Sequence, residues 1–235
     1  MNPPRPFHTG YWADEKCPPS DTMEGMIYNA NEALDASLES TSSGSLSVPS
    51  EIVQKCLYVV IFKTTEAGLI LSKRLGHGVI VANLANNPST VSNWSPPCAV
   101  SFDATGVGLT VGASVSYLLF FIMDAGALAD LLDGHGARID LSLTVGPTEK
   151  EAIFNRRVQT VSSQPTYVYA YSKGFFPSVD IRTSRLDSLL SESQRFYGLE
   201  KTLGQILLGD KEVVIPENCG VSELFEKLDM LRNKP

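Results

Sequence analysis

The sequence predicts an α+β fold: a mainly antiparallel sheet or barrel-like β core, with N-terminal, inserted and C-terminal helices. Three observations lead to this prediction. From Gly106 to Ser116 aliphatic and small residues alternate, which is the period of a strand and not of a helix. Segments of strand character follow one another through short turns, without the crossover helices that a parallel sheet needs. Capped amphipathic segments precede and follow these strands.

The N-terminal part divides into a tail, a helix and a connector. Residues 1–20 are rich in proline and lack apolar periodicity, which predicts a disordered tail. A helix is expected over residues 22–38, with Asp21 as its cap and Glu24 three residues later. Residues 40–47 are predicted to be a flexible connector. The apolar stripe of this helix consists of Met23, Met26, Ile27, Ala30, Ala33, Leu34 and Leu38.

A single domain is expected over residues 22–232, with its main body at 48–232. The body opens with a short helix, and Asp124 is expected to cap a second helix that stops at Gly134. Thr148 and Glu151 form a predicted capping box. The expected body helices cover residues 50–56, 125–133, 148–157, 186–197, 199–208 and 221–232.

The expected strands are short and consecutive. The last two are predicted to form a hairpin that turns through Lys173 and Gly174. Gly-His-Gly sequences at His77 and His135 are predicted turns. The strands cover residues 57–63, 68–75, 78–84, 98–102, 106–116, 117–123, 138–145, 165–172 and 176–184.

The twenty uncharged residues from Ala104 to Met123 admit two other readings. Their length would suffice for a membrane-spanning helix, but the alternation argues against one, and no Lys or Arg anchors either flank. The glycines from Gly106 to Gly112, followed by Asp124, resemble a dinucleotide-binding pattern. Only four residues separate Gly112 from the next apolar run, too few for a crossover helix. A pair of core strands is therefore expected.

The sequence contains no convincing catalytic or metal site. The four cysteines are widely separated, so neither a disulfide framework nor a zinc signature is expected. Cys98 as a nucleophile paired with a histidine is the one thiol alternative, and a small buried thiol is the expected state. No catalytic residue, metal or cofactor is therefore predicted.

Charge is unevenly distributed along a chain whose net charge is −7. Residues 18–54 contain six acids and no Lys or Arg, whereas residues 138–185 contain seven bases and four acids. The overall acidity excludes nucleic acid as an expected partner. The first residues lack an apolar signal segment, which predicts a cytoplasmic location.

A series of short segments has the order and spacing of a known domain family over residues 22–232. These segments are 48–56 (VPSEIVQKC), 60–62 (VIF), 67–68 (AG), 76–82 (GHGVIVA), 94–97 (WSPP), 106–112 (GVGLTVG), 120–122 (FFI), 145–147 (VGP), 169–176 (YAYSKGFF) and 196–198 (FYG). Together they resemble the SYLF domain family.

The resemblance implies a non-enzymatic peripheral membrane module that binds phosphoinositides or other anionic lipids. It implies a role in endocytic or endosomal trafficking, at the plasma or endosomal membrane. The resemblance also implies an alternative function, that of an actin-filament-binding scaffold of the cortical cytoskeleton. A nucleotide-using enzyme is the lesser alternative. The candidate lipid-binding residues are Lys55, Lys63, Lys73, Arg74, Lys173, Arg182 and Arg185.

The chain departs from the family at several positions. Thr110 stands where family members tend to have Gln, and Tyr117 where they tend to have Asp. Ser178 and Thr183 replace common glycines. Lipid binding in the family is attributed to a basic N-terminal helix, but the helix at 22–38 has an acidic polar face, which anionic lipid repels. This helix is therefore expected to pack its apolar stripe on the body.

Overall fold

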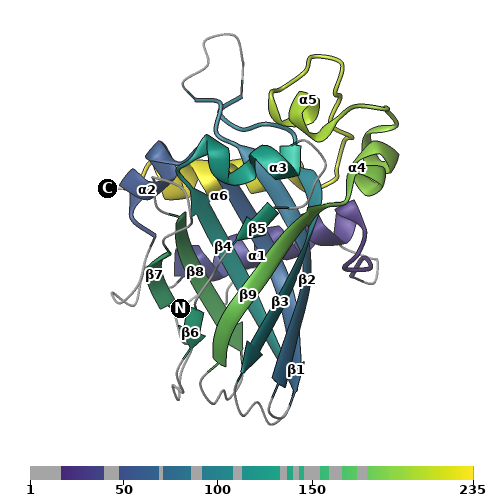
Figure 1. Ribbon diagram of the computed structural model, residues 1–235. Coiled ribbons are helices and arrows are strands. Elements are labelled where there is room, and N and C mark those ends of the chain that lie inside the picture. The colour runs from purple at the N-terminus through teal and green to yellow at the C-terminus, as the bar shows by residue number, and fades with distance from the viewer. Residues whose placement is uncertain are drawn as a thin grey trace.

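The computed structural model describes residues 17–39, 48–68, 71–85, 92–107, 113–132, 137–139, 143–145, 154–158, 166–173 and 179–234. These residues form one antiparallel sheet of nine strands, with helices on its outer face and at one of its ends (Figure 1). The α+β prediction, with N-terminal, inserted and C-terminal helices, is confirmed. The predicted tail at 1–20 and connector at 40–47 fall almost wholly outside the described residues.

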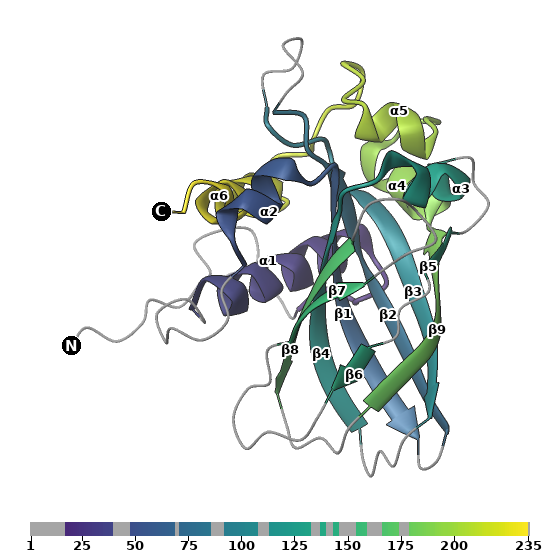
Figure 2. The same ribbon diagram turned by 60° about the vertical axis from the view of Figure 1, so that its left-hand side comes forward.

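The sheet is strongly curved. Its strand order is β5-β9-β3-β2-β1-β4-β8-β7, and β6 also pairs with β9. The short strands β6 and β7, which belong to opposite sides of the sheet, approach each other and give a barrel-like shape (Figure 2). The strands are β1 (Tyr58–Gly68), β2 (Leu71–Ala82), β3 (Cys98–Val107), β4 (Ala113–Ile122), β5 (Ala137–Ile139), β6 (Leu143–Val145), β7 (Phe154–Val158), β8 (Thr166–Lys173) and β9 (Val179–Ser188).

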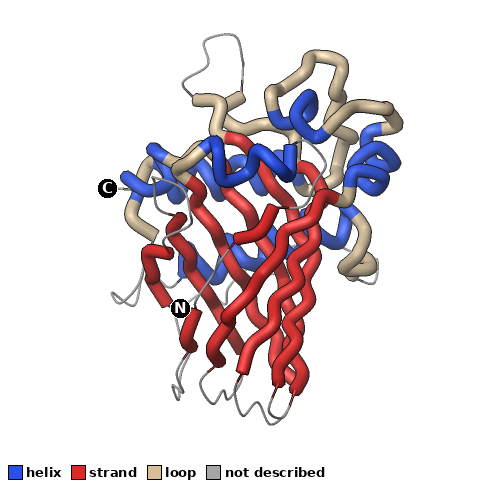
Figure 3. Tube along the Cα trace, in the orientation of Figure 1, coloured by secondary structure: helices blue, strands red, loops and turns tan. Residues whose placement is uncertain are grey.

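The described helices cover one end of the sheet and part of its outer face (Figure 3). The other end, at which β1, β3 and β8 end and β2, β4 and β9 begin, is called the strand-turn end, and no described helix lies there. Helix α1 crosses the outer face over β1 and β2, and α6 packs on α1. The helices are α1 (Met23–Glu39), α2 (Ser50–Lys55), the 3-10 helix η1 (Ala125–Leu128), α3 (Ala129–Leu132), α4 (Leu190–Tyr197), α5 (Leu203–Leu207) and α6 (Val221–Arg232).

Strand β2 runs without a break through Gly76-His77-Gly78, so the predicted turn at His77 is wrong. Gly78 lies opposite Phe62 in the sheet. A Cβ at Gly78 would lie 1.9 Å from the Ile61 carbonyl oxygen and 2.7 Å from the Phe62 ring. The glycine therefore lets a cross-strand aromatic ring pack on the backbone. His135 lies outside the described residues.

The long uncharged run divides at a different place from the predicted one. Strand β3 ends at Val107 and β4 begins at Ala113, so the expected strand over 106–116 is wrong. The two strands do not pair, because β2 and β1 lie between them. Within the described residues, the alternating small residues therefore lie at the ends of two separate strands.

Two further strand assignments need correction. Strands β8 and β9 are not the predicted hairpin: β8 pairs with β4, and β9 pairs with β3. The four-stranded unit β3-β2-β1-β4 has two open edges, and separating β8 from β9 covers both. Arg156 and Arg157 lie in strand β7 and not at the end of a helix, and residues 138–145 give two short strands instead of one.

The predicted helices are mostly confirmed. Helix α1 has the expected extent, but the side-chain cap is Thr22, whose Oγ1 accepts from the Gly25 amide at 3.2 Å, and not Asp21. Asp124 caps η1 as predicted, accepting from the Gly126 amide at 2.8 Å. Helix α4 starts at Leu190, later than the predicted 186, because β9 continues to Ser188.

Two apolar layers hold these elements together. Inside the curve of the sheet, Phe62, Phe102 and Phe120 pack with ring centroids 5.3–5.8 Å apart. Aromatic clusters of this kind contribute specific geometry beyond their buried area. On the outer face, strand residues such as Ile61 and Leu119 are buried beneath helices.

Gly78→Ala is expected to destabilise the fold by about 1–3 kcal/mol, because the added methyl group overlaps backbone and ring atoms. Urea unfolding measures the change. Gly204→Ala is the matched control, since a Cβ there has no heavy atom within 4 Å, and it should be neutral or slightly stabilising. Equal stability of Gly78→Ala and the wild type would refute this account of the Gly-His-Gly segment.

Candidate functional site

Charge separates between the sheet and the helical layer. The nine strands carry nine Lys or Arg residues and four Asp or Glu residues. The terminal helical segments, residues 17–39 and 189–234, carry six bases and thirteen acids. The sheet is therefore net positive and the helices are net negative, so an anionic partner is attracted to the strands and repelled by the helices.

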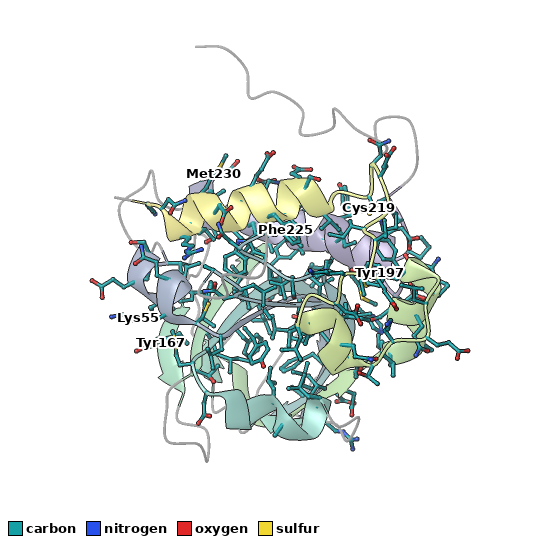
Figure 4. All side chains as sticks on the ribbon, turned by 90° about the horizontal axis from the view of Figure 1, so that it is seen from above. Lys55, Tyr167, Tyr197, Cys219, Phe225 and Met230 are labelled. Atoms are coloured by element: carbon teal, nitrogen blue, oxygen red, sulfur yellow. The ribbon has the colours of Figure 1, made fainter. Side chains whose placement is uncertain are left out.

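The structure places six of the seven predicted basic residues on strands and one apart from them. Lys55 lies in α2 at the helical end (Figure 4), where it is exposed and lies 3.6 Å from the Glu51 carboxylate. Lys63 is in β1, Lys73 and Arg74 are in β2, Lys173 is in β8, and Arg182 and Arg185 are in β9. Lys55 therefore does not belong to the same surface as the others.

One register row connects two of these positions, Lys173 and Arg185, across the outer face. Its members, taken strand by strand, are Lys173, Val115, Thr65, Leu75, Asp103 and Arg185. Thr65 is exposed, as are the large apolar side chains of Leu75 and Val115 beside it. Sequence reasoning missed this exposed apolar pair, because both residues fit strand alternation.

Two of the strand cations already have described partners. The Lys63 ammonium donates to the Asn29 side-chain oxygen of α1 at 3.1 Å, and the residue is half-buried. Arg185 is exposed and its Nε donates to the Asp187 carboxylate at 2.8 Å. The side chains of Lys73, Arg74, Lys173 and Arg182 lie outside the described part of the structure. The lipid-binding role of the whole set stays a prediction.

Helix α1 is packed on the body as expected. Met23, Met26, Ile27 and Leu34 are fully buried. Exposing these four side chains would cost roughly 6–12 kcal/mol at about 1.5–3 kcal/mol each. Insertion of this stripe into a membrane would first require that cost, and the acidic polar face adds repulsion from anionic lipid.

An ion-pair cluster from α4 holds the first turn of α1. A Glu192 side-chain oxygen accepts from the Met23 amide at 2.6 Å, which satisfies one of the free amides at the helix start. Arg195 pairs with Glu192 at 2.7 Å and with Glu24 at 2.5 Å. Hydrogen bonds from Arg195, and from the Met23 amide, lower the pKa of Glu192 below its usual value.

A buried lysine joins the second half of α1 to α6. The Lys227 ammonium lies 2.7 Å from the Asp35 carboxylate and 2.8 Å from that of Glu223, and it donates to the Asn31 carbonyl at 3.3 Å. Only 9% of the Lys227 side chain is exposed. Burial raises the pKa of Asp35, and the bond to Lys227 opposes this rise. Sequence reasoning missed this clamp, because its members lie far apart along the chain.

The described residues offer no catalytic constellation. Burial raises the pKa of the Cys56 thiol to about 12 and that of Cys98 well above its usual value, so neither is a thiolate nucleophile at neutral pH. His77 lies in mid-strand opposite Lys63. Among the described residues, no group of three or more His, Cys, Asp or Glu side chains is arranged to hold a metal ion.

The strands that flank the glycine segment contradict a dinucleotide fold. Strands β3 and β4 belong to one antiparallel sheet, whereas a dinucleotide site needs a strand followed directly by a helix. The nucleotide-using enzyme, the lesser alternative, therefore has no structural support in the described residues. In the same residues, no helix is both long enough and apolar enough to span a membrane.

Lys227→Ala is expected to destabilise the fold by about 3–5 kcal/mol, because it leaves the Asp35 carboxylate buried without its cation. Chemical denaturation measures the loss. Lys55→Ala is the matched control: this lysine also pairs with a glutamate one helical turn away, but it is exposed, and the expected change is about 0–1 kcal/mol. Similar losses of unfolding free energy in both variants would contradict a stabilising role of the buried Lys227.

The stability that Glu192 contributes is expected to depend on pH. Its pKa is lowered by folding, so the contribution is complete above the unfolded value near 4.5 and is lost as pH falls through the lower folded value. The free energy of unfolding of Glu192→Gln should therefore be lower than that of the wild type at pH 7, and the difference should shrink below about pH 4.5. A difference that stays constant into acid would contradict the ion-pair origin.

Comparisons with known proteins agree with the sequence resemblance. The family model Ysc84, described as "Las17-binding protein actin regulator", matches residues 103–231. The human protein "SH3 domain-containing YSC84-like protein 1" is 26% identical over 189 residues, which cover 80% of this chain and 52% of that protein. The Saccharomyces cerevisiae "Protein YSC84" is 26% identical over 168 residues, covering 71% of this chain and 35% of that protein.

A second yeast protein, "LAS seventeen-binding protein 3", is 25% identical over 164 residues, covering 69% of this chain and 35% of that protein. The chain thus spans about half of the human relative and a third of the yeast ones. No solved structure matches the chain. The family match covers more than half of the chain, including β4 to β9 and α4 to α6. The chain belongs to the Ysc84, or SYLF domain, family.

Proposed function

We propose that this chain is a non-enzymatic module that binds actin filaments through its positive sheet, in an actin-regulating assembly of the endocytic cortex. The observation that carries the proposal is the family match, because the matching family is described as an actin regulator. The separation of charge supports it: the strands have an excess of five positive charges, counted from nine bases and four acids. An acidic filament is attracted to such a face.

The outer face below α1 offers an open sheet surface with exposed Thr65, Leu75 and Val115. Lys173 and Arg185 lie at the two ends of the same row. A surface with cations around a small apolar centre fits a protein interface, in which a polar rim surrounds the buried contacts.

An anionic membrane surface, with phosphoinositides as its ligands, is the second candidate. The same positive strands support it, since each Lys or Arg near an anionic surface contributes about 1 kcal/mol. The geometry favours attachment by the sheet over attachment by α1, whose apolar stripe is buried. A cytoplasmic module with peripheral attachment to the plasma or endosomal membrane agrees with this candidate.

Co-sedimentation separates these two functions. The chain should pellet with actin filaments in the absence of lipid, and Lys173→Glu with Arg185→Glu should weaken binding about tenfold or more through charge reversal on one row. The control is Lys55→Glu with Lys211→Glu, which makes the same charge change at exposed positions outside the sheet and should retain binding. Vesicles with and without phosphoinositide, run without actin, test the membrane candidate.

Failure of the wild type to pellet with filaments at low salt would contradict the filament proposal. Equal loss of filament binding in both double variants would contradict a filament-binding surface on the sheet. It would indicate that binding depends on the net charge of the chain alone. Pelleting with phosphoinositide vesicles but not with filaments would replace the first candidate with the second.

A further inference from the structure

A loop at the helical end exposes two large aliphatic side chains. Leu208, at the end of α5, is 74% exposed, and Val214 is 73% exposed. These are the two most exposed of the large hydrophobic side chains in the described residues. Isolated exposed aliphatics are common, but two in one short ordered loop mark a candidate contact surface.

Internal bonds fix this loop. The Lys201 ammonium bonds to the carboxylates of Asp210, at 3.0 Å, and Glu212, at 2.5 Å. The Asp210 side chain also accepts from the Glu212 amide at 3.0 Å, and Thr202 with Gln205 forms a capping box before α5. Leu208 and Val214 therefore lie in a loop that internal bonds hold in place. In the isolated chain, contact of these two apolar side chains with water is unfavourable.

The surroundings of the loop are acidic. Residues 199–217 contain four acids and two bases. Lys201 is engaged by two of the acids, and the other charged residues of the segment, Glu200, Glu217 and Lys211, are exposed. With four acids and two bases the segment has a net charge of −2. A complementary partner would present aliphatic side chains on a positively charged surface.

The outer face of the sheet has this complementary character. Leu75 and Val115 are 47% and 40% exposed and both lie directly across from Thr65. They belong to the net positive sheet and lie toward the strand-turn end, opposite Thr65 and thus two residues beyond Lys63, whose side chain bonds to Asn29 of α1. The acidic loop lies at the opposite, helical end of the same domain (Figure 1). The two surfaces cannot meet within one copy.

We infer that this chain associates head to tail with a second copy of itself, the Leu208–Val214 loop of one copy docking on the Leu75–Val115 face of the next. The contact is heterologous, since two different surfaces meet, and a dimer formed in this way retains one free loop surface on one copy and one free sheet surface on the other. Few side chains take part, so the association is weak and depends on concentration. This inference does not require actin or lipid, and its test contains neither.

Sedimentation velocity of the purified chain gives the test. The weight-average mass should rise with protein concentration at about 0.1 M ionic strength. It should fall toward the monomer at about 1 M, where the Debye length shortens from about 10 Å to about 3 Å. Leu208→Lys with Val214→Lys breaks the loop surface, and Leu75→Glu with Val115→Glu breaks the sheet surface. Each variant alone should remain monomeric, with circular dichroism confirming its fold.

Mixing the two variants is the decisive step. Each retains one intact surface, so the mixture should form a dimer with one copy of each and nothing larger. Met230→Lys, at a 59% exposed position on the outward side of α6 (Figure 4), is the control and should associate like the wild type. A wild type that is monomeric at all concentrations would overturn the inference. So would a variant mixture without dimers, or a loss of association in the Met230 variant.

Discussion

The packing of α1 on the outer face of the curved sheet is the contact on which the rest of the structure depends. On the inner face of the sheet, aromatic rings such as Phe62 and Phe102 pack against one another. The outer face is also apolar beneath α1, and without this helix its side chains would be exposed to water. Burial of α1 is thus a condition of the fold. Glu192 at its start and Lys227 along its second half fix its position with ions from α4 and α6. The C-terminal helices are needed because they hold the N-terminal one.

This constraint decides which surfaces remain for function. A helix that completes the core is not free to enter a membrane, and its acidic outer side repels anionic partners. What stays accessible is the strand-turn half of the outer face, where the rows below α1 carry Thr65, Leu75 and Val115. The strands have an excess of bases and the helices an excess of acids. Electrostatic attraction therefore turns the strands toward an anionic partner and the helices toward a cationic one.

Local patterns in the sequence predicted the type of most elements but not how the strands pair. The stripe from Met23 to Leu34 and the cap at Asp124 are local signals, and both are confirmed. The Gly76-His77-Gly78 segment was misleading because its glycines make room for the neighbouring strand, for the Thr64 side chain at Gly76 and for the Phe62 ring at Gly78, and a local pattern does not reveal such contacts. Lys173-Gly174 likewise has the appearance of a hairpin, while the sheet places the adjoining strands on opposite sides. Pairing is decided by which edges remain open, and that is a property of the whole sheet.

The candidate surface follows the same rule. Single basic residues were visible in the sequence, yet Lys55 and Lys173 look equivalent there, whereas the structure places Lys55 in helix α2 and Lys173 at the end of strand β8. Conversely, Leu75 and Val115 looked like ordinary strand residues, and only the register shows that they are neighbours through Thr65. The position of α1 agrees with their exposure: α1 bonds to Lys63 through Asn29, and Leu75 and Val115 lie opposite Thr65, two residues further along β1. The rows that α1 leaves uncovered therefore follow from the way α1 packs on the sheet. They give the net positive sheet an exposed apolar surface.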